Sequence, residues 1–187
     1  SDGAGQREIR ARFLVDASGR DAFIASRHGR RRPIEGLGKV ALFAHFRGGR
    51  RWPGKEEGNI RIFSFEPGWF WYIPLHDGTM SVGAVVDAKR WAKTAAAGPE
   101  DTYRSLIARC PAIADRLASA TLVSPIRIIR DYSYTSTRFH GPGYLMAGDA
   151  ACFIDPVFST GVHLACLAGF LGAHAVEVLG VGQVAHH

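Results

Sequence analysis

Alternating apolar and polar residues predict β-strands over several stretches of the chain. Residues 8–15 alternate in this way, with Ile9 and Phe13 on the apolar side. Four more stretches share this period and are bounded by turn residues such as Gly and Pro. They are residues 39–47, 59–65, 69–75 and 80–86. Strands joined by such turns favour an antiparallel meander with one buried face.

Two stretches in which apolar residues recur every three to four positions predict helices. Residues 101–118 follow this spacing, and Pro111 is expected to restart the helix as a second short one. Residues 161–180 are mostly apolar and long enough to span a membrane. His163 and Glu177 favour instead a helix buried within the protein. Three small residues on one face would let a backbone or a flat ligand approach closely: Ala165, Gly169 and Ala173.

The segment that precedes this last helix is the best candidate for a binding site. Residues 144–147 predict a buried strand, and an acidic turn and a loop follow it as far as Gly161. Ser159 and Thr160 suit the position that caps a helix. Because a helix start presents free N–H groups, we expect this loop to hold an anion.

Composition indicates a globular protein with a basic surface. Hydrophobic residues make up 47% and charged residues 21% of the 187 positions, which is unlike a disordered chain. The net charge is +6, and four arginines lie close together at Arg27, Arg30, Arg31 and Arg32. Such a cluster suits an anionic dinucleotide, an acidic carrier protein or nucleic acid, although a solvated loop is its commoner explanation.

Cysteine content favours a reducing, cytoplasmic setting. Cys110, Cys152 and Cys166 are odd in number and lack the C-x-x-C spacing of a zinc site. No charged stretch followed by an apolar one opens the chain, so no secretion signal is expected. The sequence also shows no His, Cys, Asp or Glu cluster with metal-ligand spacing, and no metal is predicted.

Three stretches of the chain resemble motifs of flavin-dependent halogenases, the tryptophan-halogenase superfamily. Gly148-Asp149-Ala150 resembles the second FAD-contacting motif of flavin monooxygenases, whose Asp binds the ribityl chain. Residues 153–161 resemble the halogenase motif F-x-x-P-x-F-S-x-G, which lies between flavin and halide. Residues 69–74 match W-x-W-x-I-P, which separates these halogenases from hydroxylating relatives.

The resemblance implies a mixed α/β fold (α+β) with two parts. A partial FAD-binding domain of the flavin monooxygenase superfamily would comprise residues 1–33 and 122–187. An antiparallel substrate-domain sheet with helices would comprise residues 34–121. The family's G-x-G-x-x-G motif and catalytic lysine have no counterpart here, so the chain resembles the C-terminal part of the flavin module. We therefore expect it to be inactive on its own.

The resemblance also implies roles for particular residues. The family's cofactor contacts fall on residues near the first strand and the last helix: Asp16, Gly19, Arg20, Gly148, Asp149, Pro156 and Gly161. Two of the family's motif positions would bind the halide: Thr160 and Gly161. Five residues would separate the substrate from the flavin: Trp69, Trp71, Ile73, Pro74 and Phe158. Core packing is the alternative explanation for the tryptophan pair.

Halogenases of this kind use FAD, reduced by a separate flavin reductase, with oxygen and chloride or bromide to halogenate an aromatic ring. Tryptophan-type relatives carry a glutamate where this chain has Phe158, which implies the phenol or pyrrole branch and a role in antibiotic or other secondary-metabolite biosynthesis. The implied substrate is a small aromatic molecule, free or tethered to a carrier protein. No nucleic acid and no membrane are expected as partners. Two alternatives stay open: an FAD-dependent aromatic hydroxylase or reductase on the same scaffold, and a non-catalytic binding fragment.

Overall fold

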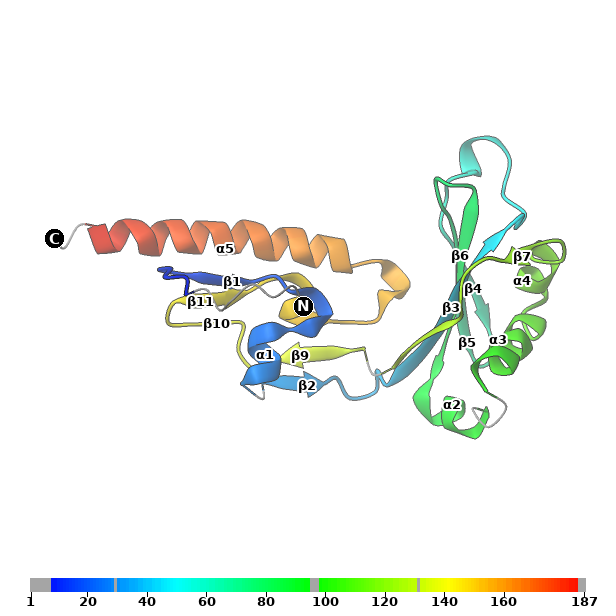
Figure 1. Cartoon of the computed structure of the whole chain (residues 1–187), viewed down its shortest axis with the longest axis horizontal. Helices are drawn as coiled ribbons and strands as arrows, with labels where there is room; N and C mark the ends of the chain where they lie inside the picture. The colour runs from blue at the N-terminus through cyan, green and yellow to red at the C-terminus, as the bar shows by residue number, and fades with distance from the viewer. Residues whose placement is uncertain (1–7, 29, 95–97, 131, 185–187) are drawn as a thin grey trace. The chain divides into compact units, whose positions relative to one another are not determined.

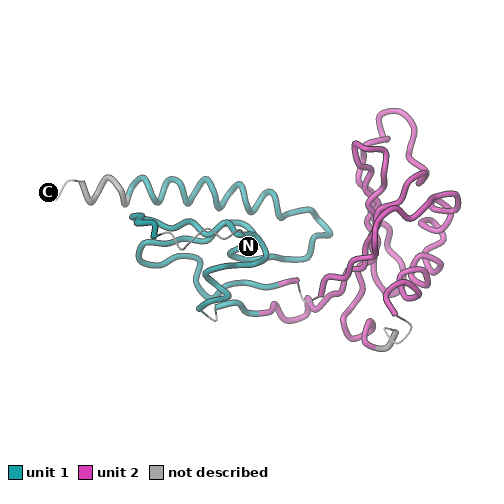
Figure 2. Tube along the Cα trace, in the orientation of Figure 1, with its two compact units in different colours: residues 1–32, 134–187 teal, residues 33–133 magenta. Residues whose placement is uncertain are grey.

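The chain folds into two compact units. Its structure is mixed α/β, as predicted. The computed structural model describes residues 8–28, 30–94, 98–130 and 132–184. Unit 1 joins residues 1–32 to residues 134–187, and unit 2 is the continuous segment Pro33–Ser133 (Figure 2). The second boundary falls later than residue 121, because strand β8 (Arg127–Arg130) pairs with strand β3 (Lys39–Arg47) inside unit 2. The two ends of unit 2 meet where the Ile34 N–H donates to the Ser133 carbonyl over 3.3 Å.

Unit 2 is built on a six-stranded antiparallel sheet in the order β4-β5-β6-β3-β7, with β8 also paired to β3 (Figure 1). Its remaining strands are β4 (Arg61–Phe65), β5 (Gly68–Pro74), β6 (Thr79–Asp87) and β7 (Thr121–Leu122). The four predicted strands are present, but the predicted meander holds only for β4, β5 and β6. Strand β3 lies beside β6 instead of β4, because these two nine-residue strands pair along their full length.

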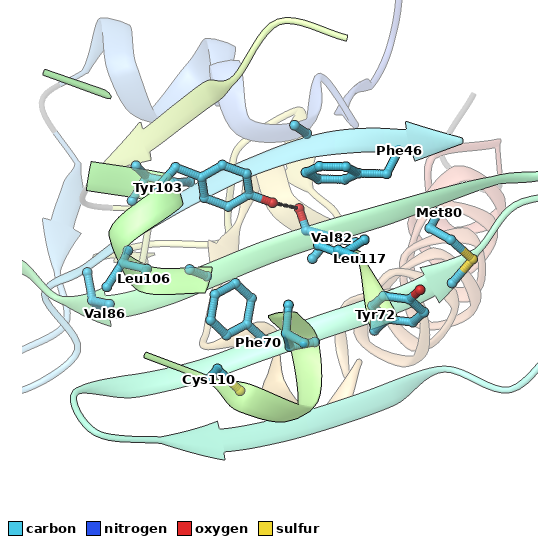
Figure 3. Packing of buried hydrophobic residues seen from close by; sticks show 14 of the residues in the cluster. Phe46, Phe70, Tyr72, Met80, Val82, Val86, Tyr103, Leu106, Cys110 and Leu117 are labelled. Atoms are coloured by element: carbon cyan, nitrogen blue, oxygen red, sulfur yellow. Dashed lines mark hydrogen bonds between the residues drawn. The ribbon is translucent and has the colours of Figure 1, made fainter. Parts of the chain in front are cut away.

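Helices cover one face of this sheet and complete a closed core. They are α2 (Ala88–Thr94), α3 (Pro99–Ala108) and α4 (Pro111–Arg116), and the predicted restart at Pro111 is confirmed. The buried Tyr103 of α3 points its hydroxyl at the sheet and donates to the Val82 carbonyl over 2.8 Å (Figure 3). Alternate sheet residues fill the space below the helices, among them Phe46, Phe70, Tyr72, Met80 and Val86.

Unit 1 contains two small sheets. Strand β1 (Leu14–Asp16) runs parallel to β11 (Tyr144–Met146), which also pairs with β10 (His140–Gly141). The second sheet has the order β12 (Cys152–Phe153), β9 (Tyr134–Ser136), β2 (Arg31–Pro33). The strand predicted over residues 8–15 is wrong for most of its length. Only Leu14 onward is β-structure, because its neighbour β11 offers just three residues to pair with.

The long helix α5 (Gly161–Val184) lies over the first sheet of unit 1 (Figure 1). The prediction that it is buried is wrong, since no residue between Gly161 and Val178 is buried. Only one stripe of it is half-buried, at Leu164, Ala168, Gly172 and Val176. By length and apolar composition alone it could cross a membrane, a test that core helices of soluble proteins also pass. Large apolar side chains therefore remain exposed, including Val162, Leu167, Phe170 and Leu171.

Candidate functional site

Asp16 at the end of β1 holds together the loop that follows it. Its Oδ1 accepts from the Ser18 N–H over 3.0 Å and from the Ser18 hydroxyl over 2.6 Å. Its Oδ2 accepts from the Ile24 N–H over 2.7 Å, which caps helix α1 (Phe23–Arg27). Burial raises the pKa of this carboxyl, but these three hydrogen bonds outweigh it and hold the pKa below its usual range. Both oxygens are thus engaged by the protein's own loop.

The same loop presents Gly19 and Arg20. Gly19 has a φ of 67°, a left-handed conformation that glycine adopts at little cost, and its carbonyl accepts from the Ala22 N–H over 3.0 Å. This loop is joined to the acidic turn after β11, because the Ala147 N–H donates to the Asp16 carbonyl over 2.9 Å. Two segments more than a hundred residues apart are thereby fixed side by side.

The acidic turn, the 3-10 segment η4 (Gly148–Ala150), requires a glycine at its first position. Gly148 has a φ of 57°, and a Cβ there would lie 3.2 Å from the Ala165 Cβ of helix α5. The helix can approach this turn closely only because both residues are small. Of the predicted small face of the helix, Ala165 therefore meets Gly148 of the acidic turn.

Asp149 carries a partly buried carboxyl group. Burial raises its pKa, and the Arg20 guanidinium opposes this shift. The Tyr134 hydroxyl donates to the Asp149 backbone carbonyl and so ties strand β9 to the turn. Sequence reasoning missed Tyr134, and no motif marks it. Only its position at the start of a strand beside the turn could have indicated it.

The loop between β12 and α5 is shaped by short-range hydrogen bonds. Asp155 Oδ1 accepts from the Val157 N–H over 3.0 Å, and Pro156 begins the 3-10 segment η5 (Pro156–Phe158). Helix α5 then begins with the Leu164 N–H donating to the Thr160 carbonyl over 3.0 Å. The N–H groups of the first helical residues, from Gly161 onward, have no partner within the helix.

Two cavities adjoin at this point and bring most of the predicted residues together. The larger, of about 570 Å³, is lined by small and apolar residues of the two loops and α5, including Gly19, Gly148, Asp149 and Gly161. The smaller, of about 230 Å³, is lined by Asp149, Pro156, Thr160 and Gly161 among others. Asp149 and Gly161 belong to both linings. Asp16 belongs to neither and holds the loop that presents Gly19.

The other predicted residues lie on different elements. Trp69, Trp71 and Ile73 project from β5 on the sheet face of unit 2 opposite the helices. All three are half-buried. The indole centroids of the tryptophan pair are 6.1 Å apart. Pro74 ends the same strand. Phe158 belongs to unit 1, where its side chain is 85% exposed.

Comparison with known proteins gives consistent matches over nearly the whole chain. The tryptophan halogenase family profile matches residues 2–173. Sulochrin halogenase of Aspergillus terreus is 35% identical over 184 residues, and tryptophan 2-halogenase of Chondromyces crocatus is 38% identical over 179 residues. Each alignment covers 94% of this chain and 34% of the relative.

A solved structure agrees with these matches. The myxobacterial chondrochloren halogenase, described as an FAD-dependent halogenase, superposes with a TM-score of 0.83 at 43% identity. The superposition covers 92% of this chain and 40% of that one. The chain thus spans about a third of the length of the curated relatives it matches.

Proposed function

Because the chain belongs to the tryptophan halogenase family, we propose that it forms the flavin-binding and halide-binding portion of an FAD-dependent halogenase. The observation that carries this proposal is the pair of adjoining cavities. Asp149 and Gly161 line both of them, so a ligand in one would touch the residues that hold a ligand in the other. A halogenase requires such an arrangement because the halide has to reach the oxygen that bound, reduced flavin would activate.

The lining of the larger cavity suits a flavin in polarity. Its lining is almost wholly small or apolar, which suits a flat ring system, and Asp149 is its one carboxylate. A Cβ on Gly161 would meet nothing within 4 Å, so no protein atom blocks the approach of a ligand to the helix backbone there. When bound and reduced, FAD supplies the electrons that activate oxygen. The protein's own part would be to hold the ring beside α5.

Asp149 would bind the hydroxyl groups of the ribityl chain. A carboxylate whose pKa is raised by burial lacks sufficient donors, and each hydroxyl offers one. Gly19 and Arg20 approach from the neighbouring loop, where a cationic side chain suits the anionic part of a dinucleotide. Asp16 contributes indirectly, by fixing that loop through Ser18 and Ile24.

The halide would bind in the smaller cavity at the start of α5. Backbone N–H groups at Thr160 and Gly161 point beyond the helix end, and the helix dipole adds about 0.3–1 kcal/mol for an anion there. No special side chain is required for a spherical ion. Pro156 and Phe158 would shape the loop around it.

The tryptophan pair is the feature that favours a halogenase over a hydroxylase. Trp69 and Trp71, with Ile73 and Pro74, would form a wall that keeps the organic substrate away from the flavin. Only the halide would then meet the activated oxygen. A hydroxylase needs the opposite, direct access of the ring to the flavin.

The substrate would be an electron-rich aromatic of the phenol or pyrrole type, in secondary metabolism. Phe158 offers an apolar ring where an acidic side chain would accept an indole N–H. Chloride or bromide would be the co-substrate, and a separate flavin reductase would supply reduced FAD in the cytoplasm. The basic surface of the chain would suit a substrate tethered to an acidic carrier protein.

The proposal can be tested with a chimeric enzyme. In it, the whole of this chain replaces the matching segment of the myxobacterial chondrochloren halogenase. With a flavin reductase, oxygen and chloride, the chimera should chlorinate a phenol or pyrrole in preference to free tryptophan. The variant Thr160→Pro should abolish chloride use, because it removes a backbone N–H, whereas Thr160→Ala should reduce it only mildly. An equal loss in both variants would contradict backbone binding of the halide. Chloride-independent hydroxylation would contradict the halogenase assignment.

A further inference from the structure

The indole of Trp71 lies flat against strand β6 because a glycine makes room for it. Gly83 is the cross-strand partner of Trp71. A Cβ on Gly83 would lie between 2.1 and 2.4 Å from the indole atoms Cζ2, Cε2 and Cη2, distances that real side chains do not tolerate. The φ of Gly83 lies outside the left-handed region, so the backbone conformation does not require glycine here. Glycine is required because any larger residue would occupy the space of the indole.

A serine two residues earlier holds the N–H of the same ring system. The Trp71 indole N–H donates to the Ser81 hydroxyl over 3.1 Å. Ser81 and Gly83 project from the same face of β6, because successive strand residues alternate between faces. One contact fixes the position of the ring, and the other fixes its orientation.

A second aromatic ring, that of Phe43, lies on the strand at the other side of β6. Gly83 pairs with Phe43 of β3 as well as with Trp71 of β5, so the glycine lies between two aromatic residues. The Phe43 and Trp71 centroids are 5.7 Å apart and tilted by 45°. A glycine inside a strand often marks a place where another group approaches the backbone closely, as these rings do here.

Trp69 differs from Trp71 in this respect. Its cross-strand partners are Val85 on β6 and Ser64 on β4, and neither is a glycine. We propose that Ser81 and Gly83 form a seat for Trp71, and that this seat makes Trp71 the fixed element of the wall. The two residues are then positioning residues that decide how well substrate and flavin are separated. This inference rests on the proposed role of the wall.

The seat can be tested by circular dichroism of the whole chain. Two indoles 6.1 Å apart give an exciton couplet in the far-ultraviolet that depends on their mutual orientation. Gly83→Ala should abolish or invert this couplet, and Ser81→Ala should weaken it, while Ser81→Thr should retain it. The matched controls are Gly58→Ala, where a Cβ meets nothing within 4 Å, and Ser105→Ala at an exposed position of helix α3. Both should leave the couplet unchanged.

A couplet unchanged in both Gly83→Ala and Ser81→Ala overturns the seat. If Gly83→Ala does not fold, the Ser81→Ala and Ser81→Thr pair decides the question alone. In the chimeric enzyme, a displaced Trp71 should raise the ratio of hydroxylated to halogenated product several-fold while FAD affinity stays constant. An altered couplet with an unaltered product ratio would keep the seat but refute the separating role of the wall, and with it the proposed effect of Ser81 and Gly83 on selectivity.

Discussion

Units 1 and 2 differ in how completely they cover their apolar surface. In unit 2, three helices close one face of the sheet, and side chains such as Phe70 and Tyr72 are fully buried. In unit 1, the single long helix α5 packs through one stripe and leaves Phe170 73% exposed. Unit 2 therefore has the contacts of a self-sufficient domain, while the stability of unit 1 rests on a small cluster around Tyr134 and Met146.

The charged residues differ less between the units. Five described arginines of unit 2 form salt bridges with carboxylates, as in Arg104 with Glu100. In the described part of unit 1, Arg10 pairs with Glu8, and Arg27, Arg30 and Arg31 lie over aromatic rings, as Arg61, Arg116 and Arg130 do in unit 2. Arg30 and Arg31 also donate hydrogen bonds, to the Tyr144 hydroxyl and to the Arg20 carbonyl. The unit with fewer internal contacts is also the one that carries the candidate site.

The largest expected effect tests the closed core of unit 2. Phe70→Ala should lower the free energy of unfolding of unit 2 by about 3–5 kcal/mol, because a fully buried ring is lost. All four tryptophans, Trp52, Trp69, Trp71 and Trp91, lie in unit 2, so their fluorescence reports on that unit alone during denaturant unfolding. The control Phe170→Ala on exposed α5 should change stability by less than about 0.5 kcal/mol. Equal effects would remove the contrast between the units.

A second prediction concerns the loop that Asp16 holds in unit 1. Asp16→Ala should destabilise unit 1 by about 1–3 kcal/mol, since the buried N–H of Ile24 loses its acceptor. Helical circular dichroism, to which α5 contributes together with the helices of unit 2, should show this loss. Tryptophan fluorescence should not respond. A parallel loss in both signals would mean that the units unfold together.

The pH dependence of unit 1 follows from the same carboxyl. The pKa of Asp16 is lower in the folded than in the unfolded protein. Its ionised carboxylate therefore stabilises the fold fully at pH values above the pKa of the unfolded state, about 3.9. This contribution is lost as the pH falls through the folded pKa. Acid titration followed by helical circular dichroism should show this loss in the parent chain and lack it in Asp16→Asn. In unit 2, Asp77 has a similarly lowered pKa through Thr79, but it is exposed and should matter less.

Asp149 should behave in the opposite way. Because burial raises its pKa in the folded state, its charged form opposes folding, and stability is lost as the pH rises through the folded pKa. At neutral pH, Asp149→Asn should therefore raise the thermal midpoint of unit 1 slightly. The same variant should weaken FAD binding in the chimeric enzyme. Lower stability without any change in FAD affinity would assign Asp149 a structural role.

The smallest effect is expected for the surface charges of unit 2. The Arg104–Glu100 pair is exposed and four residues apart on helix α3. Arg104→Gln should cost at most about 0.5 kcal/mol in urea unfolding followed by tryptophan fluorescence. A loss of more than about 1 kcal/mol would show that these ion pairs contribute substantially to the stability of unit 2.

Sequence pattern predicted the local elements of unit 2 well, because its strands have one buried face and therefore alternate clearly. It could not predict that β3 lies beside β6, since pairing depends on which strand offers a full-length partner. In unit 1 the motif at Gly148-Asp149 and the start of α5 were found in the sequence. The exposure of α5 was not, because an apolar sequence describes the side chains and says nothing about what covers them.

The candidate site shows a similar limit. Motifs indicated Gly19, Asp149, Thr160 and Gly161, and the structure brings these residues to adjoining cavities. The hydrogen bonds of Asp16 to its own loop depend on a turn that only the folded backbone reveals. Ser81 and Gly83 were also missed, although an alternating small pair opposite a tryptophan can in principle be found once strand register is known.

The hydrogen bond between Ile34 and Ser133 means that the polypeptide enters and leaves unit 2 at a single point. A segment attached in this way is an insertion, and its removal or exchange leaves only a short gap to rejoin. Evolution could therefore vary the sheet that carries Trp69 and Trp71, together with Ser81 and Gly83, as one exchangeable segment, while the acidic turn and the start of α5 stayed unchanged. The same junction offers protein engineers a place to graft a different sheet onto unit 1.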